Sequence, residues 1–441
     1  MKILVLGLSP YLLTSRSKVA ALILRYLYIK EFDIAGAVWG HDPEYFVPDD
    51  DGRSYYEFPI NGHGTHRIPL FLFHRGEKEA LEVHEIIRSA DPDLVITVGD
   101  YGDFLYMSAV KAFYTKPLKW LFVLLNYSSP INKDYYGLVN STDGILCTSK
   151  SAYDAVASFY KQDIIDIAYL GSSYKYVPQD DTDKFRIIAS GKNHQADNLP
   201  SVIEAVSQVI YKNNINMELY LHTAIHENGD YNIEDIAKDF DPHGKFIRFP
   251  DKYVSLYEGL SDGEMAIEMS KSHVFVSMSL VSASSMSVFD AISCGCYPLI
   301  SDCGSNRNIA NEIYSCSPEY NPGDFLIPTV KLMSSGGSYL HIPDIDALAE
   351  KILFLSEIYE KNKGKGKVFS EFIDRKSVLG TDSDYKQKHE EASPMGESMM
   401  HGSRFLIEKF TEGHKREGFL NKLSEMIDRV EKSDPTVCLD T

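Results

Sequence analysis

The stretch that decides the fold is residues 272–309, SHVFVSMSLVSASSMSVFDAISCGCYPLISDCGSNRNI. Its first apolar run, HVFVS, predicts a buried strand, and a polar loop follows. A helix is expected to begin near Ser284 or Ser285 and to stop at Gly295, before a second apolar strand at 297–301. This order of strand, helix and strand is typical of a parallel sheet whose strands are joined by helices.

Apolar strands alternate with amphipathic helices along most of the remaining chain. The first series has expected strands at 3–8, 34–39, 94–98, 120–125 and 144–148, with helices at 17–29 and 77–89. The second series has strands at 185–190, 217–222, 245–249, 273–277 and 297–301, with helices at 200–212, 232–239, 262–271 and 285–294. Two consecutive Rossmann-like units, with a hinge near 175–184, account for both series.

The sequence therefore predicts an α/β protein with doubly wound domains over 1–175 and 184–360. Residues 361–400 are rich in Lys, Gly, Ser, Asp and Glu without periodic apolar positions, so we expect an insertion or a mobile segment there. Residues 401–441 are expected to form a helix over 403–431 and a tail. The helix has apolar positions that need a surface to cover, at Phe405, Leu406, Phe410, Phe419, Leu420, Leu423 and Met426.

Composition narrows the class of protein. The length of 441 residues favours two domains over one. The formal net charge of −19 disfavours a broad nucleic-acid-binding surface, although one cleft can still be locally positive. The chain shows no signal-peptide pattern and no apolar run of membrane-spanning length, so a cytoplasmic protein is expected. Without paired CxxC spacing, the cysteines are expected to be reduced thiols and not metal ligands, at Cys147, Cys294, Cys296, Cys303, Cys316 and Cys438.

The loop before the helix of the 272–309 stretch carries groups that suit a nucleotide. Serine hydroxyls lie beside the free N–H groups of a helix N-terminus, a combination that binds a diphosphate, at Ser282, Ser284, Ser285 and Ser287. Asp290 falls about one and a half turns into the helix, where it can accept hydrogen bonds from a ribose diol. The alternative interpretation is a serine that caps an ordinary helix.

This stretch resembles the donor-binding signature of the retaining group 1 GT-B glycosyltransferases, the glycogen-synthase and sucrose-synthase-like superfamily. The matching residues are Ser284, Ser285, Ser287, Asp290, Ala291, Cys294, Gly295, Pro298, Ser301 and Asp302. The family usually has two glutamates eight positions apart, whereas this chain has Ser282 and Asp290. The carboxylate that binds ribose is kept in a shorter form, and the acidic contact to donor sugar and phosphate is absent.

The resemblance implies a divergent GT-B enzyme. Its fold would be two Rossmann-like domains facing a cleft, with an N-terminal acceptor domain, a C-terminal nucleotide-sugar donor domain and a C-terminal helix crossing back. Its activity would be that of a hexosyl- or pentosyltransferase, with retention and without a metal ion or cofactor. The donor would be a nucleotide-sugar, with UDP as the expected nucleotide.

The segment 189–200, ASGKNHQADNLP, follows the strand after which the family carries an Arg and a Lys for the donor diphosphate. Lys192 stands at the Arg position and Asp197 at the Lys position, so one cation is missing. His194 or Lys150 is the expected substitute, and Asp197→Lys would restore the family pattern.

The first loop supplies two further expected donor contacts, Arg16 and Lys18, where many relatives have glycines. Its sequence TSRSK also suits a simple helix cap. Asn126 ends a strand at which relatives often place a histidine, so the resemblance makes Lys192 and Asn126 the expected catalytic residues.

Three other interpretations stay open. The first is a non-catalytic GT-B partner that binds sugar nucleotides, which would explain the missing glutamate and lysine. The second is a phage-type enzyme that glycosylates modified DNA bases, and the third is a GT-B-like epimerase. The acceptor, a saccharide, small molecule or modified DNA base, and the oligomeric state are not determined by the sequence.

Overall fold

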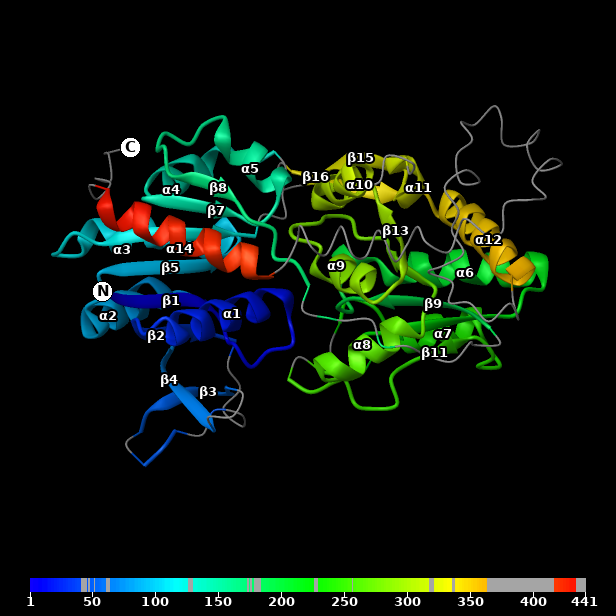
Figure 1. Cartoon of the computed structure of the whole chain (residues 1–441), viewed down its shortest axis with the longest axis horizontal. Coiled ribbons are helices and arrows are strands. Elements are labelled where there is room, and N and C mark those ends of the chain that lie inside the picture. Colours follow the sequence, from blue (N-terminus) through cyan, green and yellow to red (C-terminus); the bar gives the residue numbers. More distant parts are fainter. Residues whose placement is uncertain are drawn as a thin grey trace. The chain divides into compact units, whose positions relative to one another are not determined.

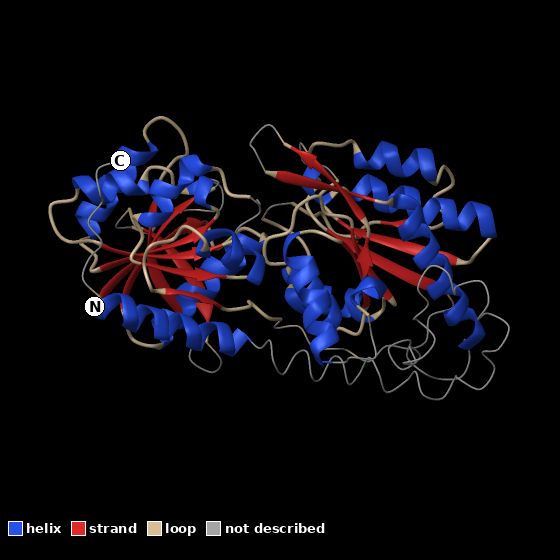
Figure 2. Ribbon diagram, turned by 90° about the horizontal axis from the view of Figure 1, so that it is seen from above, coloured by secondary structure: helices blue, strands red, loops and turns tan. Residues whose placement is uncertain are grey.

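The structure is a computed structural model in which the chain forms two compact units. Unit 1 comprises Met1–Leu170, Gly336–Ser338 and Arg416–Thr441, and unit 2 comprises Gly171–Ser335 and Tyr339–Lys415. The residues described are 1–40, 46, 48–50, 52–60, 64–125, 130–172, 174, 177, 184–225, 229–255, 257–316, 321–334, 338–362 and 416–433. Each unit has its own sheet between layers of helices (Figure 2).

Unit 1 contains an eight-stranded sheet in the order β3-β4-β2-β1-β5-β6-β7-β8. Its strands are β1 (Lys2–Leu8), β2 (Asp33–Trp39), β3 (Ser54–Pro59), β4 (Thr65–Leu72), β5 (Leu94–Gly99), β6 (Lys119–Leu124), β7 (Gly144–Cys147) and β8 (Ile165–Ile167). Its helices are α1 (Ser15–Ile29), α2 (Glu79–Ala90), α3 (Met107–Phe113), α4 (Tyr136–Asn140), α5 (Lys150–Ala157) and α14 (Arg416–Lys432), with short 3-10 turns η1 (Tyr101–Asp103) and η2 (Lys133–Tyr135). Only β3 pairs antiparallel, with β4.

Unit 2 contains a six-stranded parallel sheet in the order β11-β10-β9-β12-β13-β14 and a separate antiparallel pair, β15-β16. Its strands are β9 (Phe185–Ser190), β10 (Met217–His222), β11 (Ile247–Arg248), β12 (Val274–Ser277), β13 (Tyr297–Ser301), β14 (Leu326–Ile327), β15 (Thr329–Met333) and β16 (Tyr339–Pro343). Its helices are α6 (Leu199–Asn213), α7 (Ile233–Phe240), α8 (Asp262–Ser270), α9 (Met286–Ser293), α10 (Gly304–Cys316), α11 (Pro322–Phe325) and α12 (Ile345–Asn362), with the 3-10 turn η3 (Gln195–Asp197).

The central strands are apolar because helices cover both of their faces. Every residue of β5 is buried, as are the middle residues of β1 and β9. The thiols of Cys147, Cys294, Cys296 and Cys303 are free and buried. None of the helices in the described part of the chain combines the length and apolar character needed to span a membrane.

The strand order reverses once in each sheet. In unit 1, β1 leads to β2 on one side while β5, its other neighbour, leads to β6 on the opposite side. In unit 2, β9 leads to β10 while its neighbour β12 leads to β13 in the other direction. At such a switch point the loops at the carboxyl ends of the two strands diverge, and open α/β sheets bind their ligands there.

The C-terminal helix α14 belongs to unit 1, where it lies across the sheet (Figure 1). Its buried face contacts β6 and β7 and consists of Phe419, Leu423, Met426, Ile427 and Val430. The Lys119 ammonium group holds the helix end by donating to the carbonyls of Val430 at 2.9 Å and Ser433 at 2.7 Å. The expected return of this helix to the N-terminal unit is confirmed.

The predicted elements of both series are present, and Gly295, with φ +91°, stops α9 as expected. The hairpins β3-β4 and β15-β16 were not predicted from the sequence. Exposure alternates along β3, where Ser54, Tyr56 and Phe58 are buried, and this leaves a period of two in the sequence. It does not alternate along β15, where all residues after Thr329 are exposed. Residues 363–400 of the predicted insertion and 403–415 of the predicted final helix lie outside the described residues.

The contact of α14 with the sheet predicts an effect of Gly144→Ala. A Cβ atom at Gly144 would lie 2.7 Å from Val430 Cγ2 and 3.0 Å from Ile164 Cγ2, so the packing around Val430 must shift. We expect Gly144→Ala to lower the free energy of unfolding by about 1–3 kcal/mol in urea titrations. Val430→Ala should relieve part of that loss in the double variant, and strictly additive losses would contradict the packing described.

Candidate functional site

The loops that follow β9 and β12 are bonded to each other at the switch point of unit 2. The Leu280 amide donates to the Ala196 carbonyl at 2.8 Å, and Asn198 Nδ2 donates to the Met278 carbonyl at 3.3 Å. Because β9 and β12 are adjacent and parallel, both loops leave the same edge of the sheet. The structure therefore brings the segment of Lys192 together with the loop that contains Ser282, Ser284 and Ser285, which we call the serine loop.

Lys192 is an exposed residue two positions beyond the end of β9. Asp197 binds the backbone of Lys192 and supplies no second cation. Its carboxylate accepts the Lys192 backbone N–H at 2.9 Å, and a Cβ atom at Gly191 would lie 3.1 Å from it. Burial raises the pKa of Asp197, and the bond from the Lys192 amide opposes that rise. The carboxylate thus shapes the loop that presents Lys192.

The two expected substitutes for the missing cation have other partners. The exposed His194 accepts the Ala196 amide on Nδ1 at 3.1 Å, and its Nε2 lies 3.6 Å from Asp230 Oδ2. Lys150 is in unit 1, at the start of α5, where it forms an ion pair with Asp154.

The serine loop is held by a network of hydroxyl groups. Ser285 is the N-cap of α9 with left-handed backbone angles, φ 48° and ψ 39°, and its side chain makes no capping bond. Its hydroxyl lies 2.7 Å from Ser305 Oγ and donates to Asn306 Oδ1 at 2.5 Å. Ser282 joins the network, 2.8 Å from Ser305 Oγ. These two hydroxyls fix the shape of the loop in front of α9.

The other two expected serines lie beside the helix start. Ser284 is buried, with 4% of its surface exposed, and Ser287 is a half-buried residue in the first turn of α9. Asp290 follows Ser287 by three residues, so both lie on one side of the helix. Ser287, in the first turn of α9, and Asp290 are therefore neighbours on the same side of the helix.

Asp290 is 5% exposed and is bonded to a residue that the sequence analysis did not single out. Ser172 Oγ donates to Asp290 Oδ1 at 2.5 Å. No local pattern marks Ser172, because it precedes Asp290 by 118 residues.

Two further polar atoms were missed at this edge of the sheet. Asn193 Oδ1 and Thr223 Oγ1 are buried without a hydrogen-bond partner among the described residues. Asn193 Nδ2 donates to the Tyr231 carbonyl at 2.7 Å, which fixes the orientation of the amide. The bond from the Gly191 amide to the His222 carbonyl places the two side chains on neighbouring strand ends. Buried polar atoms that lack a partner are costly and point to a ligand.

At the switch point of unit 1, an ion pair joins the segments that follow β1 and β5. Arg16 Nη1 lies 2.6 Å from Asp103 Oδ2, which also accepts the Asp100 amide at 2.9 Å. Lys18 is a half-buried residue in the first turn of α1. Thr14 caps α1 by accepting the Ser17 amide, as the helix-cap interpretation of this loop expects. Asn126 lies outside the described residues.

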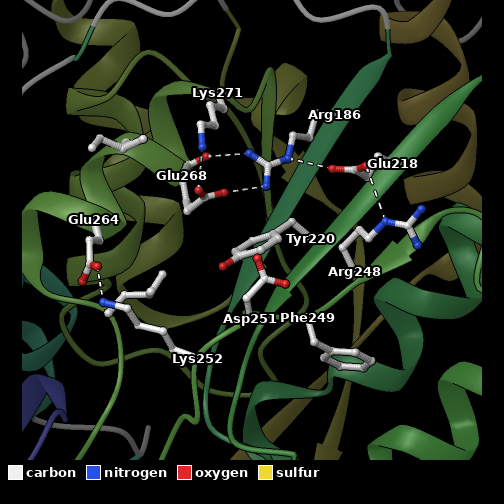
Figure 3. Close-up of a pocket in the computed structure, with 12 residues that line it drawn as sticks. Arg186, Glu218, Tyr220, Arg248, Phe249, Asp251, Lys252, Glu264, Glu268 and Lys271 are labelled. Atoms are coloured by element: carbon white, nitrogen blue, oxygen red, sulfur yellow. Dashed lines mark hydrogen bonds and ion pairs between the residues drawn. The ribbon is translucent and has the colours of Figure 1, made fainter.

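A cavity of about 430 Å³ in unit 2 contains none of the expected site residues (Figure 3). Arg186 lies in it, bonded through Nε to Glu218 at 3.0 Å and through Nη2 to Glu268 at 2.6 Å. Its guanidinium carbon lies 4.7 Å from the centre of the Tyr220 ring, and Lys271 pairs with Glu268 at 2.8 Å. Most of the charged side chains that line the cavity therefore pair with each other, and these ion pairs connect β9 and β10 to α8.

No group of three or more His, Cys, Asp or Glu side chains gathers as a potential metal site in the described part of the chain. No protein-family model matches the sequence, and no curated protein matches it either.

Solved structures match over nearly the whole chain at low sequence identity. Sucrose-phosphate synthase from Thermosynechococcus elongatus matches with a TM-score of 0.63 and 11% identity, over 98% of this chain and 99% of that one. The E. coli trehalose-6-phosphate synthase bound with UDP-2-fluoro glucose has a TM-score of 0.60 and 9% identity, over 99% and 100% of the chains. S. aureus TarM in complex with fondaparinux, α-GlcNAc-glycerol and UDP has a TM-score of 0.59 and 10% identity, over 98% and 100%.

These similarities establish the fold. The chain has the two-unit α/β fold of the GT-B glycosyltransferases, as the resemblance of the donor-binding signature implies.

The geometry of Asp197 predicts the outcome of the change that would restore the family pattern. A lysine cannot accept the Lys192 amide, whereas an asparagine can. We expect Asp197→Lys to lower the free energy of unfolding by about 1–3 kcal/mol and Asp197→Asn to lower it less. Urea titrations of both variants measure this, and an Asp197→Lys variant as stable as the parent would contradict the assigned role of Asp197.

Proposed function

We propose that this chain is a glycosyltransferase that transfers a sugar from a nucleotide-sugar donor, with UDP as the expected nucleotide, to an acceptor hydroxyl. The observation that carries the proposal is the arrangement at the switch point of unit 2. A cation, the start of a helix and a buried carboxylate occur there at one edge of the sheet. The TarM and trehalose-6-phosphate synthase structures of the same fold hold UDP or a UDP-sugar.

Each of these groups has a role in the proposed reaction. An acceptor hydroxyl oxygen attacks the anomeric carbon as the bond from that carbon to the donor phosphate oxygen breaks. Negative charge develops on the departing diphosphate, which takes up the proton of the hydroxyl. Lys192 and the N–H groups of α9 stabilise that charge, with Ser287 beside them. Asp290 accepts the hydroxyl groups of the ribose. Transfer with retention and without a metal ion is part of this proposal.

Asn193 and Thr223 extend the proposed donor site. Among the described residues their buried oxygens have no hydrogen-bond partner. Asn193 follows Lys192 in the loop after β9, and Thr223 follows β10, the neighbouring strand. A bound donor offers N–H and O–H groups that would satisfy them and so recover the cost of their burial. This accounts for polar atoms that the fold alone leaves without partners.

A binding protein without transfer activity is the second candidate. The specific observation in its favour is Ser282, which stands where relatives have an acidic residue and is engaged with Ser305. Thermal-shift measurements with UDP-, GDP- and ADP-sugars, followed by assays of nucleotide release, separate the candidates. The enzyme binds a donor and releases its nucleotide as the sugar passes to an added acceptor or to water. The binding protein is stabilised by the donor, so that its melting temperature rises, and it releases no nucleotide.

Asp290→Ala tests the ribose contact. We expect the dissociation constant of the bound nucleotide to rise by the equivalent of about 1–3 kcal/mol, because a buried carboxylate that holds a diol is lost. Isothermal titration calorimetry measures this change, with Asp239→Ala, an exposed carboxylate on α7, as the matched control. Unchanged affinity in a folded Asp290→Ala variant would rule out the ribose role.

Lys192→Ala tests the charge on the leaving group. We expect turnover to fall by roughly a hundredfold, as when one preorganised charge-stabilising group is removed from an active site. The control is Lys245→Ala, which removes an exposed lysine that precedes β11 in the same unit. Full activity of Lys192→Ala would mean that the diphosphate is held elsewhere, and Arg16 and Lys18 would be tested next.

A further inference from the structure

Three described residues near the start of unit 2, Ser172, Tyr174 and Val177, are hydrogen-bonded to two of its helices, and we call them the strap. Tyr174 Oη donates to Asp262 Oδ1 at 3.1 Å at the start of α8. The Val177 amide donates to Ser270 Oγ at 3.0 Å at the end of the same helix. Ser172 reaches Asp290 in α9. The strap is therefore bonded to both α8 and α9, and α9 carries the Asp290 of the proposed donor site.

The Ser172 hydroxyl is fixed in direction by two bonds. Its oxygen accepts the Tyr174 amide at 2.9 Å, and its proton is donated to Asp290 Oδ1 at 2.5 Å. A serine hydroxyl has one proton, so this arrangement commits that proton to the carboxylate. The short distance is typical of a hydroxyl bonded to an ionised acceptor.

This bond matters because Asp290 is buried. An ionised carboxylate with 5% exposure needs hydrogen-bond donors to remain charged, and Ser172 supplies one. A carboxylate has about four lone-pair sites, so one carboxylate can accept a bond from Ser172 and bonds from the two hydroxyls of a ribose. The side chain of Asp290 is also one methylene shorter than the glutamate in the donor-binding signature. The orientation of its carboxylate therefore decides whether it can contact the ribose.

We propose that Ser172 is a positioning residue of the donor site, which holds the Asp290 carboxylate in the direction that receives the ribose diol. The inference rests on the proposed function, since it concerns the same donor. It makes Ser172, in addition to the loops of the unit 2 sheet, a determinant of nucleotide affinity. It also predicts that the contribution of Ser172 is specific to the ribose hydroxyls.

The test compares ribonucleotides with their deoxy counterparts. Dissociation constants of UDP, GDP and ADP and of their 2′-deoxy forms are measured by calorimetry for the parent, Ser172→Ala, Ser172→Thr and Asp290→Ala. Tyr174→Phe is the matched control, because it removes the bond to Asp262 and keeps the backbone amide that orients Ser172.

We expect Ser172→Ala to bind the preferred ribonucleotide about three- to tenfold more weakly, the loss typical of one hydrogen bond. Its affinity for the deoxynucleotide should change less, so the preference for ribose shrinks. Ser172→Thr, which keeps the hydroxyl, and Tyr174→Phe should retain that preference. If Ser172→Ala lowers kcat but leaves the preference for ribonucleotides over deoxynucleotides unchanged, Ser172 does not position the carboxylate for the ribose.

The remaining outcomes separate this inference from the proposed function. If Asp290→Ala weakens ribonucleotide binding and Ser172→Ala does not, Asp290 contacts the ribose without help from the strap, and the inference alone fails. Tighter binding by Ser172→Ala would mean that Ser172 competes with the ribose, which also overturns it. If none of the nucleotides binds the parent protein, the proposed function and the inference fail together.

Discussion

The reversal of strand order between β9 and β12 is the constraint on which the proposed site depends. Crossover connections in parallel sheets are right-handed, so the helices that follow the two strands lie on opposite faces of the sheet. The loops at the two strand ends then diverge, and their polar groups face a space that no helix of these crossovers fills. Lys192 and the start of α9 lie at that edge for this reason, with Asp290 one turn further along the helix.

The residues at which this chain departs from the donor-binding signature make structural contacts. Asp197 stands where relatives have a cation, and it holds the loop of Lys192 through a backbone amide. Ser282 stands where relatives have an acid, and it bonds to Ser305. In unit 1, Arg16 is paired with Asp103. In the proposed site, Lys192 and the helix start would neutralise the charge of the donor diphosphate, in a protein whose formal net charge is −19.

The sequence predicted the fold well because buried parallel strands and the helices between them leave strong local patterns, as in 94–98 and 217–222. It could not predict which polar residues meet. Ser172 and Asp290 are distant in the sequence, and the partners of Ser285 come from α10, beyond the next strand. Asn193 and Thr223 are single polar residues after apolar strands, and only their burial without partners distinguishes them. Contacts of this kind depend on how loops close in three dimensions and not on periodicity.

The central claim is that the carboxyl edge of the unit 2 sheet binds a nucleotide at the switch point. A crystal structure of the chain with the tightest-binding nucleoside diphosphate tests it most directly. The account predicts density between the loop of Lys192 and α9, with the ribose hydroxyls on Asp290 and the diphosphate near Lys192. Nucleotide bound instead in the cavity around Arg186 and Tyr220, with the switch point empty, would contradict the account.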